Sequence, residues 1–457
     1  MPAAFKKVAG SICAPRGFRA ASVFCDIKRL GTGKGSEKGR KRDLALIVSE
    51  VPAVVAGMFT ANQVCAAPVK VSAKHCADGS ARAIVVNSGN ANACTGARGM
   101  RDAQKMARLT AEIVAAVYDR RNGNETAVID RRYRTLRPNE VLVASTGRIG
   151  VTMPMANVER GIRMCAPLLT RSASAARDVA EAIMTSDTRR KEVAVECKVG
   201  STTIRIGGIC KGAGMIQPGM IEAKALHATM LGFIMTDAAV ERSFLRKALA
   251  AAVRTSFNRI TVDGDMSTND SVIALANGLA GNRRLSVSSP ASRRKIFQQA
   301  LDYVCLQLAK MIVLDGEGVS RFVTVKVSGA RNDSDGEAVA RAIANSALVK
   351  TSWHGGDPNW GRIICATGYS AAKVDESRMD IGYSRPGHSK ILYGFRNGGP
   401  TKTSLLQLAA ITARPEFDVH VNLRVGHGQF VMYASDLTED YVSFNKGDVS
   451  DPTSLGG

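Results

Sequence analysis

The chain is poor in aromatic residues. Phenylalanine, tyrosine and tryptophan make up 5% of its 457 residues, and only two residues are tryptophan. Because single-stranded nucleic acids are usually bound by stacking bases on aromatic side chains, this composition does not indicate such a module. Acidic residues are also outnumbered, with 40 against 62 basic residues and a formal charge of +22. The excess favours anionic partners, small carboxylates among them, and we predict no nucleic-acid partner.

Metal-binding motifs and long apolar runs are missing as well. None of the ten cysteines has the C-x-x-C spacing of a zinc site or a redox dithiol, so we predict free thiols and no metal. No run reaches the ~18 to 20 apolar residues that a membrane span needs, and we predict no membrane partner and a cytoplasmic protein. Residues 1–25 contain basic but no acidic residues, which is typical of a mitochondrial transit peptide. The mitochondrial matrix is therefore the alternative compartment.

Apolar, β-branched runs bounded by glycine or polar residues alternate with stretches of helical period, which predicts a mixed α/β protein. The predicted strands are Ala45–Val48, Ala83–Asn87, Val141–Ser145, Thr202–Ile206, Ser271–Leu275, Phe322–Val327, Arg362–Ala366, Val419–Val425 and Gln429–Ala434. The predicted helices lie around residues 106–117, 158–184, 239–255, 297–308 and 337–349. The order lacks the strict alternation of strand and helix that marks a doubly wound sheet.

Two polar strings follow predicted strands. NSGNANACTG begins at Asn87, and STGRIG begins at Ser145. In the second string, the N–H of Gly147 beside the hydroxyl of Thr146 is a pair of donors suited to a developing oxyanion. Each string on its own is equally well explained as a structural turn.

A further segment places a threonine hydroxyl between a small residue and an apolar run. KGAGMI begins at Lys211, and Ala228-Thr229 precedes the apolar run MLGFIM, which we interpret as helix-forming. A threonine in that position is most often a helix cap, although its hydroxyl can also attack the preceding carbonyl. Later, the dense polar string at 256–270 runs into a predicted strand, and polar groups packed against a core require partners. We therefore predict a site or a buried polar network there.

Taken in order, these strings resemble one family. NSGNANACTG, STGRIG, KGAGMI, ATMLGFIMTDA, SFNRITVDGD with STND, DGEG, DPNWGRI and DLTEDYV closely resemble the glutamate N-acetyltransferase/ornithine acetyltransferase family of arginine biosynthesis. The matching segments run from about Ala14 to Ser450. One short motif is weak, but this series is specific.

The resemblance implies a fold, a processing step and a site. The implied fold is a layered αββα-type sandwich with two lobes and the active site between them. Self-cleavage between Ala228 and Thr229 would give an α chain, 1–228, and a β chain, 229–457, assembled as an α2β2 heterotetramer. The site residues implied by matching positions are Thr229 as nucleophile, Thr146 and Gly147 as the oxyanion pair, and Thr185, Lys211, Thr229, Glu317, Asn445 and Ser450 as substrate-binding residues.

The implied reaction moves an acetyl group from N-acetylornithine to glutamate through an acetyl-threonine. A threonine hydroxyl is a poor nucleophile until a base takes its proton, and cleavage would give Thr229 a free α-amine with a pKa of ~7.7 to 8.0. Release of one amine and attack by a second make a ping-pong cycle. No cofactor is implied, and acetyl-coenzyme A as a second donor is left open.

Two alternatives stay open, and one of them rests on a departure from the family pattern. The segment 221–227, IEAKALH, is a stretch that the family pattern usually lacks, directly before the predicted cleavage point. An uncleaved, inactive relative that acts as a binding protein is therefore one alternative. The other is an N-terminal-nucleophile amidase that uses the same Thr229 but gives the acyl group to water.

Overall fold

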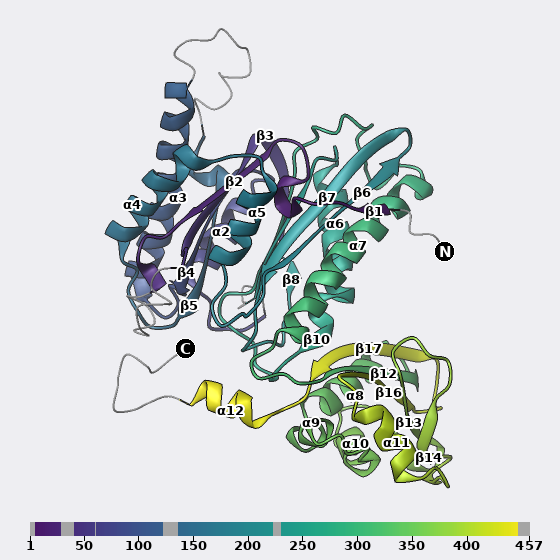
Figure 1. Ribbon diagram of the computed structural model, residues 1–457. Helices are drawn as coiled ribbons and strands as arrows, with labels where there is room; N and C mark the ends of the chain where they lie inside the picture. Colours follow the sequence, from purple (N-terminus) through teal and green to yellow (C-terminus); the bar gives the residue numbers. More distant parts are fainter. Residues whose placement is uncertain (1–4, 29–40, 60, 122–135, 223–229, 447–457) are drawn as a thin grey trace.

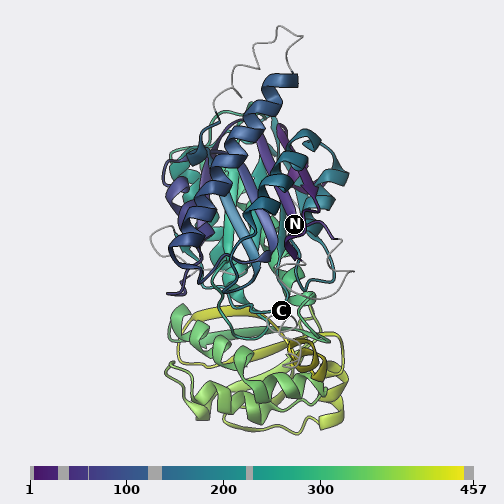
Figure 2. The ribbon, with the colours of Figure 1, turned by 90° about the vertical axis from the view of Figure 1, so that its left-hand side faces the viewer.

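The chain forms two lobes of unequal size. The computed structural model describes residues 5–28, 41–59, 61–121, 136–222 and 230–446, without the side chains of 118–121 and 221–222. This part of the chain contains one ten-stranded and one seven-stranded sheet. Figure 1 shows the larger sheet with its helices above the smaller lobe, and the turned view in Figure 2 shows the same stacking. The predicted mixed α/β class and the two lobes are confirmed.

The larger sheet has the strand order β1-β6-β7-β9-β11-β3-β4-β5, with β2 and β8 paired to β3. Its strands are β1 (Phe5–Lys7), β2 (Phe18–Val23), β3 (Leu44–Phe59), β4 (Ser80–Asn90), β5 (Val141–Arg148), β6 (Lys191–Val199), β7 (Thr202–Lys211), β8 (Ile221–Glu222), β9 (Leu231–Thr236) and β11 (Ser271–Ala276). Most neighbours are antiparallel, but β4 pairs with β5 in parallel and β9 pairs with β11 in parallel. Within each parallel pair, the two strands therefore end at the same edge of the sheet. The site residues on β5 lie at such an edge.

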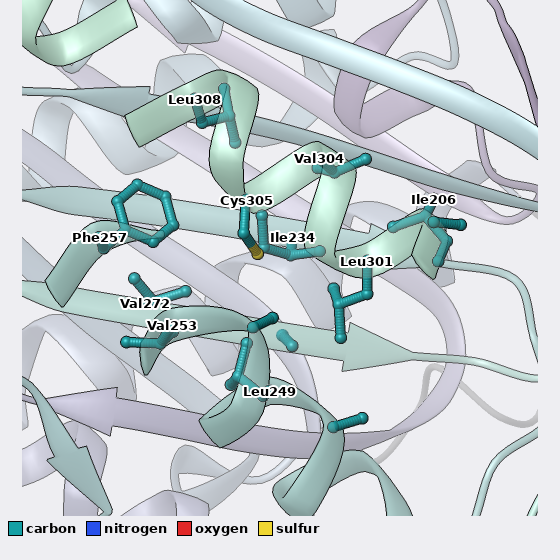
Figure 3. Packing of buried hydrophobic residues seen from close by; sticks show 14 of the residues in the cluster. Ile206, Ile234, Leu249, Val253, Phe257, Val272, Leu301, Val304, Cys305 and Leu308 are labelled. Atoms are coloured by element: carbon teal, nitrogen blue, oxygen red, sulfur yellow. The ribbon is translucent and has the colours of Figure 1, made fainter. Parts of the chain in front are cut away.

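Alternating side chains of this sheet enter different cores, as the pleat of a strand requires. Ile84 joins a central cluster and Val85 a cluster beneath helices α3 and α4, while Phe233 joins the central cluster and Ile234 one beneath α6 and α7. Both halves of the sheet thus contribute side chains to the central cluster. Helices cover the opposite face of each half. Figure 3 shows the cluster beneath α6 and α7. The helices of this lobe are α2 (Ala67–Cys76), α3 (Gly96–Arg121), α4 (Met155–Cys165), α5 (Ala173–Ala182), α6 (Arg242–Thr255) and α7 (Ala291–Leu314).

The smaller lobe is a seven-stranded sheet in the order β10-β17-β12-β16-β13-β14-β15. Its strands are β10 (Ile260–Thr261), β12 (Phe322–Ala330), β13 (Asp380–Ser384), β14 (Leu392–Arg396), β15 (Gly399–Pro400), β16 (Glu416–Asn422) and β17 (Gly428–Ser435). Its helices are α8 (Asp333–Asn345), α9 (Ala347–His354), α10 (Trp360–Gly368), α11 (Leu405–Thr412) and α12 (Glu439–Asn445). Short strand β10 comes from between α6 and β11 but pairs with β17, so it ties the two lobes together.

Two predicted elements are wrong. The segment Arg362–Ala366 lies in α10, where the side chain of Asn359 caps the helix by accepting the N–H of Arg362 at 3.2 Å. The apolar run after Thr229 is strand β9, because it pairs with β7 on one side and β11 on the other. Short apolar runs fit either structure by periodicity, and these neighbours decide the outcome.

The predicted chain boundary does not separate the lobes. Residues 228 and 229 lie outside the described residues, between β8 and β9. Strand β9 is in the middle of the larger sheet, so the predicted second fragment would supply β9 and β11 to a sheet built otherwise from the first. All ten cysteines are free. Among the helices in the described ranges, none is long and apolar enough to cross a bilayer.

Candidate functional site

Thr146 and Gly147 lie where β5 ends, side by side with the end of β4. Ser88 is opposite Thr146, and Gly89 is opposite Gly147. Gly147 has a φ of +128°, and a Cβ there would lie 2.3 Å from the carbonyl carbon of Gly89. Only glycine fits such a position, for both conformation and space. The predicted oxyanion pair is therefore built on a backbone that requires glycine.

Lys211, the last residue of β7, connects the predicted threonines. Its side chain is buried, and its ammonium donates to the hydroxyls of Thr185 at 2.7 Å and Thr146 at 3.2 Å. Burial lowers the pKa of Lys211, against the attraction of Asp187. Within the described residues, no carboxylate lies within ion-pairing distance of this ammonium. A buried cation whose hydrogen-bond acceptors among the described residues are hydroxyls is suited to an anionic ligand.

The hydroxyl of Thr146 is also informative. A hydroxyl has one proton to donate and two lone pairs. Because the Thr146 oxygen accepts from Lys211, its own proton is directed elsewhere. This is the arrangement that a hydroxyl donor in an oxyanion hole requires.

Glu317 and Asn445 meet beside the loop that follows β7. The N–H of Glu317, which follows α7, donates to the carbonyl of Ala213 at 3.0 Å. A Cβ on Gly214 would lie 2.4 Å from a carboxylate oxygen of Glu317, so that side chain covers Gly214 closely. Asn445, at the end of α12, donates to the same oxygen at 3.0 Å. Figure 1 shows α12 leaving the smaller lobe and extending beneath the larger one.

Three predicted residues, Ala228, Thr229 and Ser450, lie outside the described residues. The chain is described again from Met230, which is buried and whose carbonyl accepts the N–H of Ser271 at 2.7 Å. Leu231, two residues after Thr229, pairs directly with Lys211. The described residues next to the predicted nucleophile are thus beside the buried lysine.

The polar string at 256–270 forms a buried network, as predicted. The amide of Asn269 donates to the carbonyls of Ala91 at 2.7 Å and Ser145 at 2.8 Å. Its oxygen accepts the hydroxyl of Thr268 at 2.7 Å. Asn269 therefore links the segment that follows β4 to the strand that carries Thr146. No specific role was predicted for Asn269.

The fold and these contacts define an α/β protein in which a buried lysine contacts two hydroxyls at the end of β7, and a carboxylate lies over the loop that follows β7. Such a site is suited to a small molecule that carries both an anion and a cation. The family model of ArgJ matches residues 20–447, and this chain belongs to the ArgJ family. The resemblance found in the sequence, and the assignment to this family of enzymes, are confirmed.

Several known proteins are similar over almost the whole chain. The arginine biosynthesis bifunctional protein ArgJ of Symbiobacterium thermophilum is 43% identical, over 96% of this chain and 98% of that protein. The protein of the same name from Geobacter sulfurreducens is 43% identical over 94% and 98%. Among solved structures, ArgJ of Bacillus halodurans is 41% identical, with a TM-score of 0.43 over 46% of this chain and 95% of that chain. Ornithine acetyltransferase of Mycobacterium tuberculosis, complexed with ornithine, is 36% identical, with a TM-score of 0.39 over 48% and 100%.

Proposed function

We propose that this protein transfers an acetyl group from N-acetylornithine to glutamate, as a step of arginine biosynthesis. The observation that carries the proposal is the contact of the Lys211 ammonium with the hydroxyls of Thr146 and Thr185, at the strand end that pairs with Leu231. Both substrates carry an α-carboxylate, which a buried ammonium with hydroxyl neighbours can bind. The names of the curated relatives agree with this assignment.

In the proposed chemistry, cleavage between Ala228 and Thr229 frees the α-amine of Thr229. This amine takes the proton of the Thr229 hydroxyl, whose oxygen attacks the acetyl carbonyl. The hydroxyl of Thr146 and the N–H of Gly147 donate to the developing oxyanion. The amide C–N bond then breaks, and the α-nitrogen of ornithine leaves with the proton. Attack by the amine of glutamate on the threonine ester returns the enzyme and gives N-acetylglutamate.

The remaining residues have roles in recognition. Lys211 and Thr185 bind the carboxylate that donor and acceptor share, and this accounts for the use of one site by both substrates. Glu317, held by Asn445, binds the side-chain ammonium of ornithine or passes a proton to the reacting amine. Ser450 completes the substrate contacts.

Cleavage would leave the two fragments bound to each other. The second fragment would place β9 between β7 and the pair β11-β3, with backbone hydrogen bonds on both sides. A fragment built into the middle of a sheet does not dissociate without unfolding that sheet. We propose an α2β2 assembly in the cytoplasm, with acetyl-coenzyme A as an optional second donor.

The experiment is a mass measurement followed by a stepwise reaction. Intact-mass analysis should show two fragments that join at Ala228-Thr229. Incubation with N-acetylornithine alone should add one acetyl group to the fragment that begins at Thr229, and glutamate should then remove it as N-acetylglutamate. Release of acetate without an amine acceptor would instead indicate an amidase. Full-length chain with no acetyl transfer would overturn the proposal in favour of a binding protein.

A further inference from the structure

Three charged side chains form a buried group behind the site. The ammonium of Lys191, the first residue of β6, lies 2.6 Å from a carboxylate oxygen of Asp187 and 2.6 Å from one of Asp315. The three side chains are 1%, 0% and 3% exposed, respectively. Burying three charges has a large desolvation cost, which the attraction between them often only offsets. The stability of the fold alone is therefore a weak explanation for this ion triad.

The Asp187 carboxylate connects the triad to two substrate-site segments. One oxygen accepts the N–H of Thr185 at 3.0 Å, and the other accepts the N–H of Gly212, next to Lys211, at 2.7 Å. Burial alone would raise the pKa of Asp187, but the charges of Lys211 and Lys191 and the Gly212 N–H hold it at about 2. Asp187 is thus ionised, and both of its oxygens are available as acceptors.

Asp315 connects the triad to a third segment. It caps the end of α7, two residues before Glu317, and one of its oxygens accepts the N–H groups of Thr188 at 3.1 Å and Arg189 at 3.2 Å. The Thr188 hydroxyl also donates to it. The triad therefore fixes the loop of Thr185, the end of β7 and the turn that leads to Glu317 against one another.

We infer that Asp187, Lys191 and Asp315 are positioning residues for amino-acid recognition, which set the spacing between the carboxylate-binding pair Lys211–Thr185 and the carboxylate of Glu317. The inference rests on the proposed function. None of the three is among the residues that we propose to contact the substrate. Lys191 fixes the rotation of the Asp187 carboxylate, and that carboxylate fixes Thr185 and Lys211 through separate oxygens, so one displacement would move both.

The first test is Asp187→Asn. The amide has nearly the same shape, but it replaces one acceptor oxygen by a donor, and Lys191 keeps Asp315 as its partner. We expect KM for N-acetylornithine and for glutamate to rise together by about tenfold, as expected for a lost hydrogen bond to a charged group, with a change in kcat of less than about threefold. Self-cleavage should persist. Asp315→Asn, which leaves the pair Lys191–Asp187, should raise KM for N-acetylornithine more than KM for glutamate.

The matched control is Asp418→Asn in the smaller lobe. Asp418 is 3% exposed and pairs with Lys326, whose side chain is 37% exposed, so the substitution also removes an ion pair of a buried carboxylate. It should lower the melting temperature without changing either KM. If the site variants behave in the same way, with lower melting temperatures and both KM values within about twofold, the triad is only structural and the inference is wrong.

A binding measurement separates this inference from the proposed function. Calorimetric titration with ornithine reports recognition without turnover. Ornithine binding by the unaltered protein without any acetyl transfer would contradict the proposed reaction alone, and the triad would then be tested by the loss of ornithine affinity in Asp187→Asn. If the unaltered protein binds neither ornithine nor glutamate, the recognition site itself is absent and both proposals fall.

Discussion

Both lobes bury lysines, and Lys211 in the larger lobe and Lys350 in the smaller one meet different partners. Lys211 in the larger lobe donates to two side-chain hydroxyls from separate segments. Lys350 in the smaller lobe donates to the carbonyl and the hydroxyl of Ser435, at the end of β17. Burial lowers the pKa of both. Burial and a lowered pKa therefore do not distinguish a lysine in a site from a structural one. The difference is that Lys211 donates to hydroxyls of two separate segments, whereas Lys350 donates to a single residue, including its backbone carbonyl.

The sharpest test of this difference between the lobes compares two glycines. Gly147→Ala places a Cβ 2.3 Å from Gly89, and Gly398→Ala in the smaller lobe places one 2.6 Å from Ser377, with both residues at positive φ. Both variants should melt at a lower temperature. Only Gly147→Ala should also lose two to three orders of magnitude in kcat, because a misplaced oxyanion donor costs ~2.7 to 4 kcal/mol.

A second variant covers the case in which Gly147→Ala does not fold. Thr146→Val keeps the size and branching of the side chain but removes the hydroxyl. It should reduce kcat for acetylation of the Thr229 fragment in a rapid-quench measurement. The prediction would be wrong if folded Thr146→Val were acetylated at an unchanged rate and both glycine variants lost kcat to a comparable extent. The larger lobe would then be no more important for catalysis than the smaller one.

The two buried lysines themselves give the next largest effect. Lys211→Met should lower kcat/KM by roughly 30- to 150-fold, or about 2 to 3 kcal/mol, because the substrate carboxylate loses its buried partner. Its melting temperature should hold or rise, since a buried cation is removed. Lys350→Met should leave kcat/KM within about twofold. Equal losses of activity in both variants would show that the partners of a buried lysine do not predict its role.

Part of this arrangement could be predicted from the sequence. The strands that carry Thr146 and Lys211 have β-branched runs that end in glycine-containing strings, and the family motifs indicated the residues that meet there. The strand after Thr229 was interpreted as helix-forming, because its pairing with β7 and β11 depends on distant segments. Lys191 gave no signal at all. It follows two arginines in the sequence, as solvent-exposed lysines often do, and only the fold brings Asp187 and Asp315 to it.

The pH dependence of stability gives a smaller effect, located in the smaller lobe. Burial lowers the pKa of Lys350 from 10.5 to about 8. Between these values the unfolded chain binds more protons than the folded protein, so stability rises as the pH increases from about 8 to 10.5. For one such group the slope is at most ~1.4 kcal/mol per pH unit.

Lys350→Met should remove this contribution. Melting temperatures measured from pH 7.5 to 10 should increase less steeply with pH in the variant than in the unaltered protein. Lys28, whose pKa burial also lowers to about 8, adds to the slope in both proteins and therefore cancels in the comparison. Identical pH profiles for the two proteins would mean that folding does not lower the pKa of Lys350.

The smallest expected effect concerns α12, which belongs to the smaller lobe by sequence position but serves the site of the larger one. Asn445 is exposed and donates to Glu317 at 3.0 Å, so its hydrogen bond competes with water and contributes about 0.5 to 1 kcal/mol. Asn445→Ala should therefore raise KM for N-acetylornithine by roughly two- to fivefold, with the melting temperature unchanged. Ser443→Ala, on the same exposed helix, is the matched control and should change neither quantity. Because Glu317 faces the ornithine ammonium in the proposed complex, KM for glutamate should change less than KM for N-acetylornithine in Asn445→Ala. Equal changes for both substrates would place Asn445 at the shared carboxylate instead, and no change in either would confine the site to the larger lobe and the turn that carries Glu317.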